Sequence, residues 1–216
     1  MRRLALIALL LPAGLLAKAD GPGAPLVAAD EAYTRAIQRD GVWTATRAFA
    51  LPQSEMFIPK RVRTLEYGKD LPEPPYKIDS RTEQAWISCD SSVGVTLSRW
   101  KIAKYGLQGW VEVVWARMSD GSYRILLQQA GTLPRKLFSH PGRKGARAAC
   151  AGKPPPLPIM APAVGTDFKL GASYDQTMIW SSAVTEQGEV RIVVSLWNGT
   201  VHEPVLEDVA PAAPAR

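Results

Sequence analysis

The first clear pattern of apolar and polar residues lies between residues 28 and 51. From residue 28 to 39, apolar residues recur about one helical turn apart, and Asp30 brings a negative charge to the first turn, where the helix dipole favours it. Gly41 interrupts the pattern, and residues 42–51 resume it until a proline ends it. We therefore predict two consecutive helices.

Beyond residue 56 the apolar period shortens to two, as β-strands require. Met56, Phe57 and Ile58 are predicted to form a short strand that ends at a proline, and the next twenty residues to be mostly irregular. The dipeptide Asp120-Gly121 indicates a hairpin turn, because both residues tolerate positive φ. Four strands are predicted around this turn, at residues 82–89, 93–102, 108–117 and 123–131.

The last third of the chain begins with a basic loop at residues 135–147 and a proline-rich linker at 153–163. Helices and one strand followed by antiparallel strands are typical of an α+β fold, here extended by a C-terminal β meander. The strands of this meander are predicted at residues 176–185, 190–197 and 200–206.

Residues 1–19 have the three parts of a cleavable export signal. Two arginines give a positive start, an almost wholly apolar run follows, and Ala17-Lys18-Ala19 offers the small residues that a signal peptidase needs. The apolar run is shorter than the roughly 20 residues that span a bilayer. We expect cleavage after Ala19, no membrane span in the mature chain, and a periplasmic or extracellular destination.

Removal of the signal changes the charge of the chain. It takes away three of the 26 basic residues and none of the 20 acidic ones, so the net charge falls from +6 to +3. That bias is too weak to indicate nucleic-acid binding, which calls for a clustered basic face. The remaining chain is long enough to bury a substantial core.

Cys89 and Cys150 are the only cysteines in the sequence. An exported chain meets an oxidising environment, so we expect these two residues to form a disulfide; the alternative is two free buried thiols. Neither cysteine has a histidine nearby, and His140 and His202 lack the spacing of metal ligands. We predict neither a metal site nor a cofactor.

Five short segments together resemble a known family: Ala29-Asp30-Glu31, Asp40-Gly41, Met56-Phe57-Ile58-Pro59, Val114-Trp115-Ala116-Arg117 and Asp120-Gly121-Ser122-Tyr123. Their order is similar to that in the SnoaL-like and ketosteroid-isomerase-like branch of the nuclear transport factor 2-like superfamily. The resemblance covers about residues 28–133. It implies a cone-shaped, curved antiparallel sheet packed on the N-terminal helices around an apolar pocket, the default ligand site.

The resemblance also implies where an isomerase would keep its catalytic groups. The position of the family's general base, just before the proline that ends the strand, is Ile58 here, which cannot accept a proton. Tyr33 lies near the place of the family's tyrosine donor and could face the pocket; the alternative is that it simply packs in the core. We therefore expect no catalytic residue of the isomerase type.

Several apolar and aromatic residues are candidates to line the implied pocket. Met56 and Ile58 share the strand parity of the family's base position. Four tryptophans could add ring contacts, although the favoured interpretation of the same residues is that they fill the core. Glu112 or Gln128 could instead point inward from a strand, and a buried glutamate could act as an acid or a base. The predicted ligand-binding set is Tyr33, Trp43, Met56, Ile58, Trp86, Trp100 and Trp115.

These observations predict an exported, non-catalytic protein that binds a small apolar ligand or a protein partner in its pocket. The alternative is an isomerase-like, cyclase-like or hydrolytic enzyme that uses a relocated acid such as Glu112. A homodimer formed through the outer face of the sheet is a third hypothesis. The predicted segments are a signal peptide at 1–19, a leader at 20–27, the cone domain at 28–134, a loop and linker at 135–163, a β extension at 164–209 and a disordered tail at 210–216.

Overall fold

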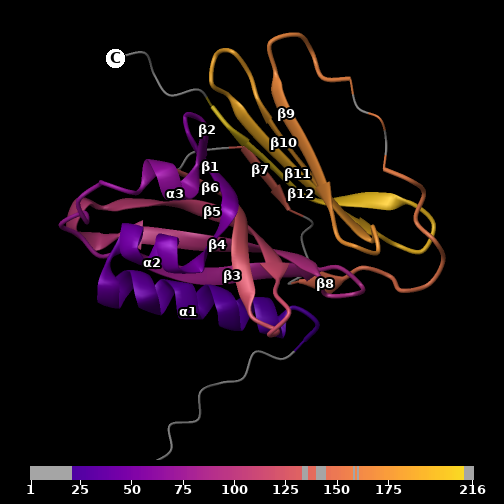
Figure 1. Ribbon diagram of the computed structural model, residues 1–216, viewed down its shortest axis with the longest axis horizontal. Helices are drawn as coiled ribbons and strands as arrows, with labels where there is room; N and C mark the ends of the chain where they lie inside the picture. The colour runs from indigo at the N-terminus through magenta and orange to yellow at the C-terminus, as the bar shows by residue number, and fades with distance from the viewer. Residues whose placement is uncertain (1–20, 133–135, 140–144, 158, 160, 212–216) are drawn as a thin grey trace, which may run out of the picture.

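A computed structural model describes residues 21–132, 136–139, 145–157, 159 and 161–211 of the chain. The predicted export signal therefore lies outside the described residues, as do His140 and most of the predicted C-terminal tail. The described residues form two β-sheets, with helices on one face of the first sheet (Figure 1).

The first sheet has the strand order β2-β1-β6-β5-β4-β3-β8 and the second β7-β12-β11-β10-β9. The helices are α1 (Ala24–Asp40), α2 (Val42–Phe49), the short α3 (Thr64–Tyr67) and a 3-10 turn, η1 (Ala103–Tyr105). The first sheet contains β1 (Ala50–Ile58), β2 (Lys60–Arg63), β3 (Asp79–Ile87), β4 (Val93–Ile102), β5 (Leu107–Arg117), β6 (Tyr123–Thr132) and β8 (Ala146–Arg147). The second contains β7 (Lys136–Ser139), β9 (Asp167–Ala172), β10 (Met178–Val184), β11 (Val190–Trp197) and β12 (His202–Ala210).

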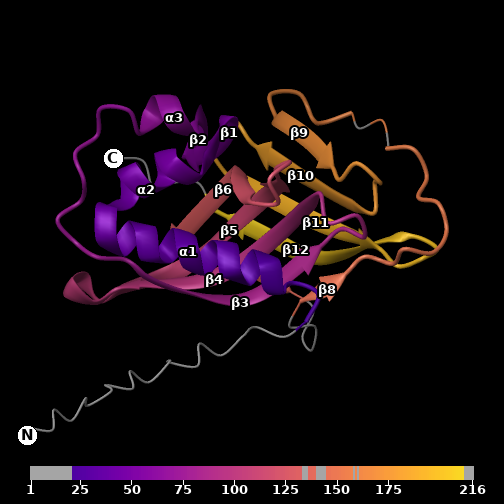
Figure 2. The ribbon, with the colours of Figure 1, turned by 60° about the horizontal axis from the view of Figure 1, so that its bottom comes forward.

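The two predicted helices are present, and the first is longer than expected. It begins at Ala24, within the segment expected to be a leader, with a proline in its first turn. The extra turn buries Leu26 completely against β4. A Cβ built at Gly94 would lie 2.2 Å from Leu26 Cδ1, so the glycine lets the helix approach the strand closely. Figure 2 shows α1 lying across the strands of the first sheet.

The α+β prediction, with helices on a curved sheet and a C-terminal meander, is confirmed. Strands β3 to β6 pair antiparallel in sequence order, and Gly121 has φ +84° in the turn before β6. The first sheet is nevertheless mixed, because β1 pairs parallel with β6 and β3 pairs parallel with β8. A register shift between Val114 and Trp115 adds a β-bulge, a feature that bends a strand.

The C-terminal meander is larger than the sequence pattern predicted. Strands β9 to β12 pair antiparallel in succession. The first of them, β9, precedes the first strand predicted for the meander. Strand β7 lies in the segment predicted to be a basic loop and pairs with β12. Because β7 and β12 are far apart in the chain, local periodicity could not reveal their pairing.

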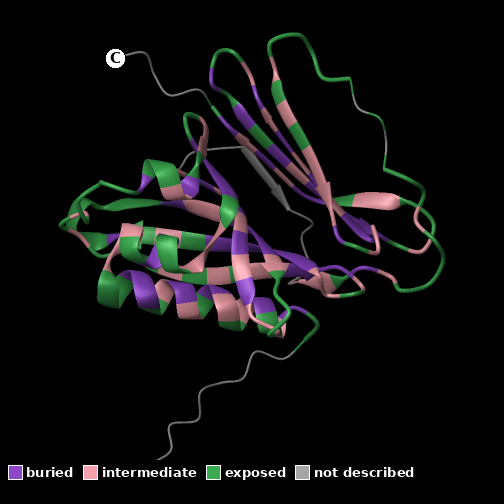
Figure 3. Ribbon diagram, viewed as in Figure 1, coloured by how far each residue is buried: buried purple, intermediate pink, exposed green. Residues whose placement is uncertain are grey.

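The largest apolar cluster lies between the two sheets. It joins Trp86, Val95 and Val114 of the first sheet to residues such as Trp180 and Leu206 of the second. Figure 3 shows buried residues along the strands of both sheets. The face of the first sheet that was expected to pair with a second copy is thus covered by the chain's own meander.

The predicted disulfide between Cys89 and Cys150 is confirmed, with Cα atoms 5.2 Å apart. It connects the turn after β3 to the segment that leads to the meander. Asp90 and Asp175 make a second link nearby. The Asp90 backbone N–H donates to Asp175 Oδ2 at 2.9 Å, and the Asp175 N–H donates to Asp90 Oδ2 at 3.1 Å. These bonds hold the β3–β4 turn against the β9–β10 turn.

A buried arginine joins the two sheets at the other end. Only 6% of the Arg61 side chain is exposed. Its Nε donates to Asp167 Oδ2 at 2.8 Å, and its Nη1 donates to Glu55 Oε2 at 3.2 Å and to Ser182 Oγ at 3.0 Å. The guanidinium also lies 5.0 Å from the ring centroid of Phe57. Arg61 therefore ties β1 and β2 to β9 and β10.

Arg61→Ala is expected to destabilise the fold by about 3 kcal/mol, because it leaves buried polar groups without their partner. The matched control is Lys101→Ala, whose ion pair with Asp79 is exposed and should contribute less than about 1 kcal/mol. Urea denaturation of both variants measures the free energy of unfolding. Equal effects of the two substitutions would show that Arg61 does not hold the sheets together.

Candidate ligand cavity between the first helix and the sheet

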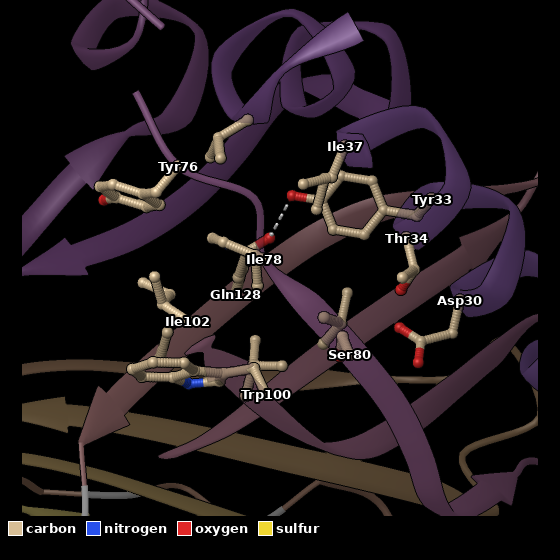
Figure 4. Close-up of a pocket in the computed structure, with 14 residues that line it drawn as sticks. Asp30, Tyr33, Thr34, Ile37, Tyr76, Ile78, Ser80, Trp100, Ile102 and Gln128 are labelled. Atoms are coloured by element: carbon tan, nitrogen blue, oxygen red, sulfur yellow. Dashed lines mark hydrogen bonds between the residues drawn. The ribbon is translucent and has the colours of Figure 1, made fainter. Parts of the chain in front are cut away.

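A cavity of about 240 Å³ lies between α1, the segment that precedes β3 and the first sheet (Figure 4). Most of its wall is apolar and comes from strands β3 to β6 and from the first two helices. The apolar and aromatic lining residues are Tyr33, Ile37, Val42, Tyr76, Ile78, Trp100, Ile102, Val111, Val113 and Ala130. The polar ones are Asp30, Thr34, Ser80 and Gln128.

Asp30 is the one acid that lines the cavity, and it is held by hydroxyl groups. Its Oδ2 accepts hydrogen bonds from Thr82 Oγ1 and Ser98 Oγ, both at 2.6 Å. Its Oδ1 accepts a longer bond of 3.4 Å from Thr96 Oγ1. Burial raises the pKa of the Asp30 carboxyl above its ordinary value, and the three hydroxyl donors offset only part of this rise.

Tyr33 lies one turn after Asp30 on α1 and belongs to a second hydrogen-bonded group. Its hydroxyl lies 2.7 Å from Thr46 Oγ1 and donates to Gln128 Oε1 at 3.2 Å. Burial raises the pKa of Tyr33 to about 12, so the phenol stays neutral. Within the described part of the chain, Gln128 Nε2 has no hydrogen-bond partner, so its N–H groups are available to a ligand.

The segment between α3 and β3 forms one wall of the cavity and is fastened to both helices. Glu73 accepts hydrogen bonds from the first turn of α2, including one of 2.7 Å from the Thr44 N–H. Lys77 Nζ donates to the Gln38 carbonyl oxygen near the end of α1. Between these two anchors, Tyr76 lines the cavity and packs against Tyr105, with ring centroids 5.7 Å apart.

Two of the seven predicted ligand-binding residues, Tyr33 and Trp100, line this cavity. The indole N–H of Trp100 donates to the Trp110 carbonyl oxygen at 3.0 Å, which fixes its ring on β4. Gln128, considered as an inward-pointing polar residue, lines the cavity as well. The structure therefore brings together residues from α1, β4 and β6.

The other five predicted residues lie outside the cavity. Ile58 is 38% exposed at the end of β1, and Met56 is buried in the same strand without reaching the cavity. Trp43 packs against Tyr67 of α3, with ring centroids 5.8 Å apart. The expectation that Met56 and Ile58 point into one pocket fails because β1 lies at the side of the sheet, beyond β6.

Trp86 and Trp115 belong to the core, which was the alternative considered for the tryptophans. Trp86 lies in the cluster between the two sheets. Trp115 lies on the helix side, where its Nε1 donates to Thr96 Oγ1 at 2.9 Å. Since Thr96 in turn contacts Asp30, Trp115 supports the cavity indirectly.

Glu112 is fully buried but lies on the opposite face of β5 from the cavity. Its neighbours Val111 and Val113 line the cavity, and strand alternation turns Glu112 the other way, together with Val114 of the inter-sheet cluster. The relocated acid of the enzyme alternative is therefore not Glu112.

The position of Asp30 in the cavity wall differs from the one predicted from the sequence. Asp30 was assigned to the first turn of a helix, but α1 begins at Ala24 and places this residue in the helix interior. The buried residues Leu26, Asp30, Tyr33 and Ile37 follow one another at intervals of three and four, which is the spacing of a helix face turned toward the core. An acidic residue among the apolar positions of this stripe is the sequence feature that indicates a buried polar site.

No protein-family model matches the chain, and no curated protein matches it. Three solved structures are similar to part of it. A cystatin-like fold protein from Burkholderia xenovorans has 14% identity and a TM-score of 0.41, over 50% of this chain and 89% of that one. A nuclear transport factor 2-like superfamily protein from Salmonella enterica serovar Typhimurium has 16% identity and a TM-score of 0.38, over 54% and 94%. An LEH-like epoxide hydrolase from M. tuberculosis has 19% identity and a TM-score of 0.35, over 48% and 75%.

Neither a membrane-spanning helix nor a metal-binding cluster is found among the described residues. Within the ranges that the structure describes, no helix is both long enough and apolar enough to cross a membrane. The same ranges contain no group of three or more histidine, cysteine or acidic side chains placed to hold a metal ion.

The raised pKa of Asp30 predicts a pH-dependent stability. The folded chain holds this proton more tightly than the unfolded chain, so the stabilisation is complete below the ordinary pKa of 3.8 and is lost as pH rises through the folded value. Asp30→Asn is neutral at every pH, so its free energy of unfolding relative to wild type should increase between pH 4 and 8. Urea denaturation across this range measures the difference.

Asp120→Asn is the control of opposite sign. A hydrogen bond from Ser122 lowers the pKa of Asp120, so its contribution is present above the ordinary pKa and is lost as pH falls. The Asp120→Asn variant should therefore lose stability relative to wild type as pH rises toward 3.8, and between pH 4 and 8 the difference should stay nearly constant. A constant difference between Asp30→Asn and wild type across the range would contradict a raised pKa for Asp30.

Proposed function

We propose that the chain is an exported protein that binds a small, mainly apolar ligand in the cavity beside α1 without converting it. The observation that carries this proposal is the cavity itself, about 240 Å³ in volume, with apolar walls and a few polar groups. Apolar cavities of about 150 Å³ already hold benzene. The space is therefore suited to one ring with a short substituent.

The positions of the polar groups favour binding over catalysis. Ile58, at the expected position of a general base, is outside the cavity and carries no titratable group. Tyr33 and Gln128 are hydrogen-bonded to each other, which fixes both side chains in the cavity wall. The amide group of Gln128 is left as a hydrogen-bond donor for a ligand. A protein partner is less well supported, because the apolar face of the first sheet is already covered by the meander.

An enzyme that uses Asp30 is the second candidate. One specific observation favours it: Asp30 lines the cavity and burial raises its pKa, which are the conditions under which a carboxyl group can transfer protons near neutral pH. This candidate replaces Glu112 with Asp30 as the relocated acid. Turnover of a bound compound by wild type, lost in Asp30→Asn while binding persists, would establish it.

Export is supported by the predicted signal at residues 1–19 and by the disulfide. Structural disulfides form and persist in oxidising compartments such as the bacterial periplasm or the extracellular space. Cys89 and Cys150 are 61 positions apart, so their bond closes a long loop and constrains the unfolded chain. A chain that stayed in a reducing compartment would lose this constraint.

Filling the cavity should abolish ligand binding. Ser80 lies on β3 in the cavity wall, and Ser80→Phe places a ring in the space that a ligand would occupy. Binding of fluorobenzene, followed by ¹⁹F NMR, is expected for wild type and should weaken by on the order of tenfold or more in this variant. The matched control is Ser119→Phe at an exposed position, which should bind as wild type does. Equal binding by both variants would show that the ligand site lies elsewhere.

Expression of the full chain in a bacterium should yield an exported protein that begins at Asp20. Signal peptidase removes the positive and apolar segments after the small residues at positions 17–19. Intact mass of the periplasmic and extracellular fractions tests this. Alkylation without reductant should add no label, and alkylation after reduction should add two. An uncleaved chain confined to the cytoplasm would contradict the export proposal.

A further inference from the structure

The cavity has a single charged side chain. Of the residues that line it, all of which the structure describes, Asp30 alone carries a formal charge when ionised. No lysine, arginine or histidine lines the cavity to balance it. A buried carboxylate without a counter-charge is costly, and a cation brought in by a ligand would relieve that cost.

We propose that the ligand is a small amine whose ammonium group binds the Asp30 carboxylate while its apolar body packs among Trp100, Ile102 and Val113. This inference rests on the proposed function, because it names the chemical class of the ligand for the same cavity. The amine proposal adds to the proposed function that Asp30 is the residue that determines ligand specificity.

The hydrogen bonds at Asp30 leave room for such a ligand. A carboxylate has about four lone-pair sites. Oδ2 already accepts two short bonds from Thr82 and Ser98, whereas Oδ1 accepts one bond of 3.4 Å from Thr96. Figure 4 shows the carboxylate pointing from α1 toward the interior of the cavity. Oδ1 therefore has capacity for an N–H donor from a ligand.

Among the described residues, the groups around Asp30 donate hydrogen bonds to its carboxylate but include no positive charge that would neutralise it. The strands that pack against it, β3 and β4, present hydroxyl groups. On its own helix, Glu31 is negative and Tyr33 stays neutral. Three donated hydrogen bonds stabilise the carboxylate form, yet burial still raises its pKa. An incoming ammonium supplies the missing positive charge and forms a charge-assisted hydrogen bond, which is stronger than a neutral one.

The rest of the cavity suits the remainder of an amine of this size. Trp100 and Tyr76 provide aromatic surface, on which an apolar ring can pack and a cation can gain further attraction. Ile78 and Ile102 add aliphatic surface. Because no other formal charge lines the cavity, a doubly charged ligand or an anion would be rejected.

Two isosteric probes test the proposal on the full mature chain. Benzylamine and benzyl alcohol have nearly the same shape, but only the amine is cationic at neutral pH. Titration calorimetry at pH 7 should show that benzylamine binds tighter than benzyl alcohol by on the order of tenfold, the worth of a charge-assisted hydrogen bond. Asp30→Asn should remove that preference, whereas Glu31→Gln, at the exposed neighbouring position, should keep it.

The pH dependence gives a readout that needs no variant. As pH rises through the raised pKa of Asp30, the carboxyl ionises while benzylamine stays cationic, so benzylamine should bind tighter and benzyl alcohol should not. Equal or tighter binding of benzyl alcohol on both sides of this pKa would overturn the amine proposal and leave the cavity as a ligand site. If neither probe bound, and fluorobenzene also failed to bind, the proposed function would fall together with the amine proposal.

Discussion

The first sheet has two apolar faces, and each must be removed from water. The helices cover one face, and the C-terminal sheet covers the other through the cluster that includes Trp86 and Val114. The disulfide and the Arg61 network fasten the C-terminal sheet at separate places. Burial of this apolar area is the main stabilising contribution, and the polar links fix the relative position of the two sheets.

The same arrangement creates the cavity. Leu26 packs closely on Gly94 near the start of α1, so this end of the helix is held tightly against the sheet. Further along α1, Asp30 and Tyr33 line the cavity, together with Gln128 of β6. Each of them is hydrogen-bonded within the protein, which allows polar groups to lie beside an apolar space without a prohibitive cost. A rigid support and an accessible polar group are both properties of ligand-binding sites.

The residues around Asp30 also illustrate how a core position can be polar. Thr82, Ser98 and Thr96 lie on two adjacent strands, and their side chains face the same helix. Strand residues that would otherwise be aliphatic are hydroxyl-bearing here. Such a cluster stabilises fold and charge together, and substitution of a single member would leave the others partly unsatisfied.

The sequence by itself determined the local elements. Periodicity identified the two helices, strands β3 to β6 and much of the meander, and the predicted export to an oxidising environment indicated that Cys89 pairs with Cys150. Only the tertiary structure decided the parallel pairing of β1 with β6, the insertion of β7 beside β12, and the set of residues that meet at the cavity. Periodicity shows that a residue faces inward, but whether it meets core atoms or an open space depends on contacts between segments that are distant in the chain. In the sequence, Asp30 belongs to a helical stripe of buried residues. Only the packing of α1 on the sheet places its carboxyl group against three hydroxyl groups and beside a cavity.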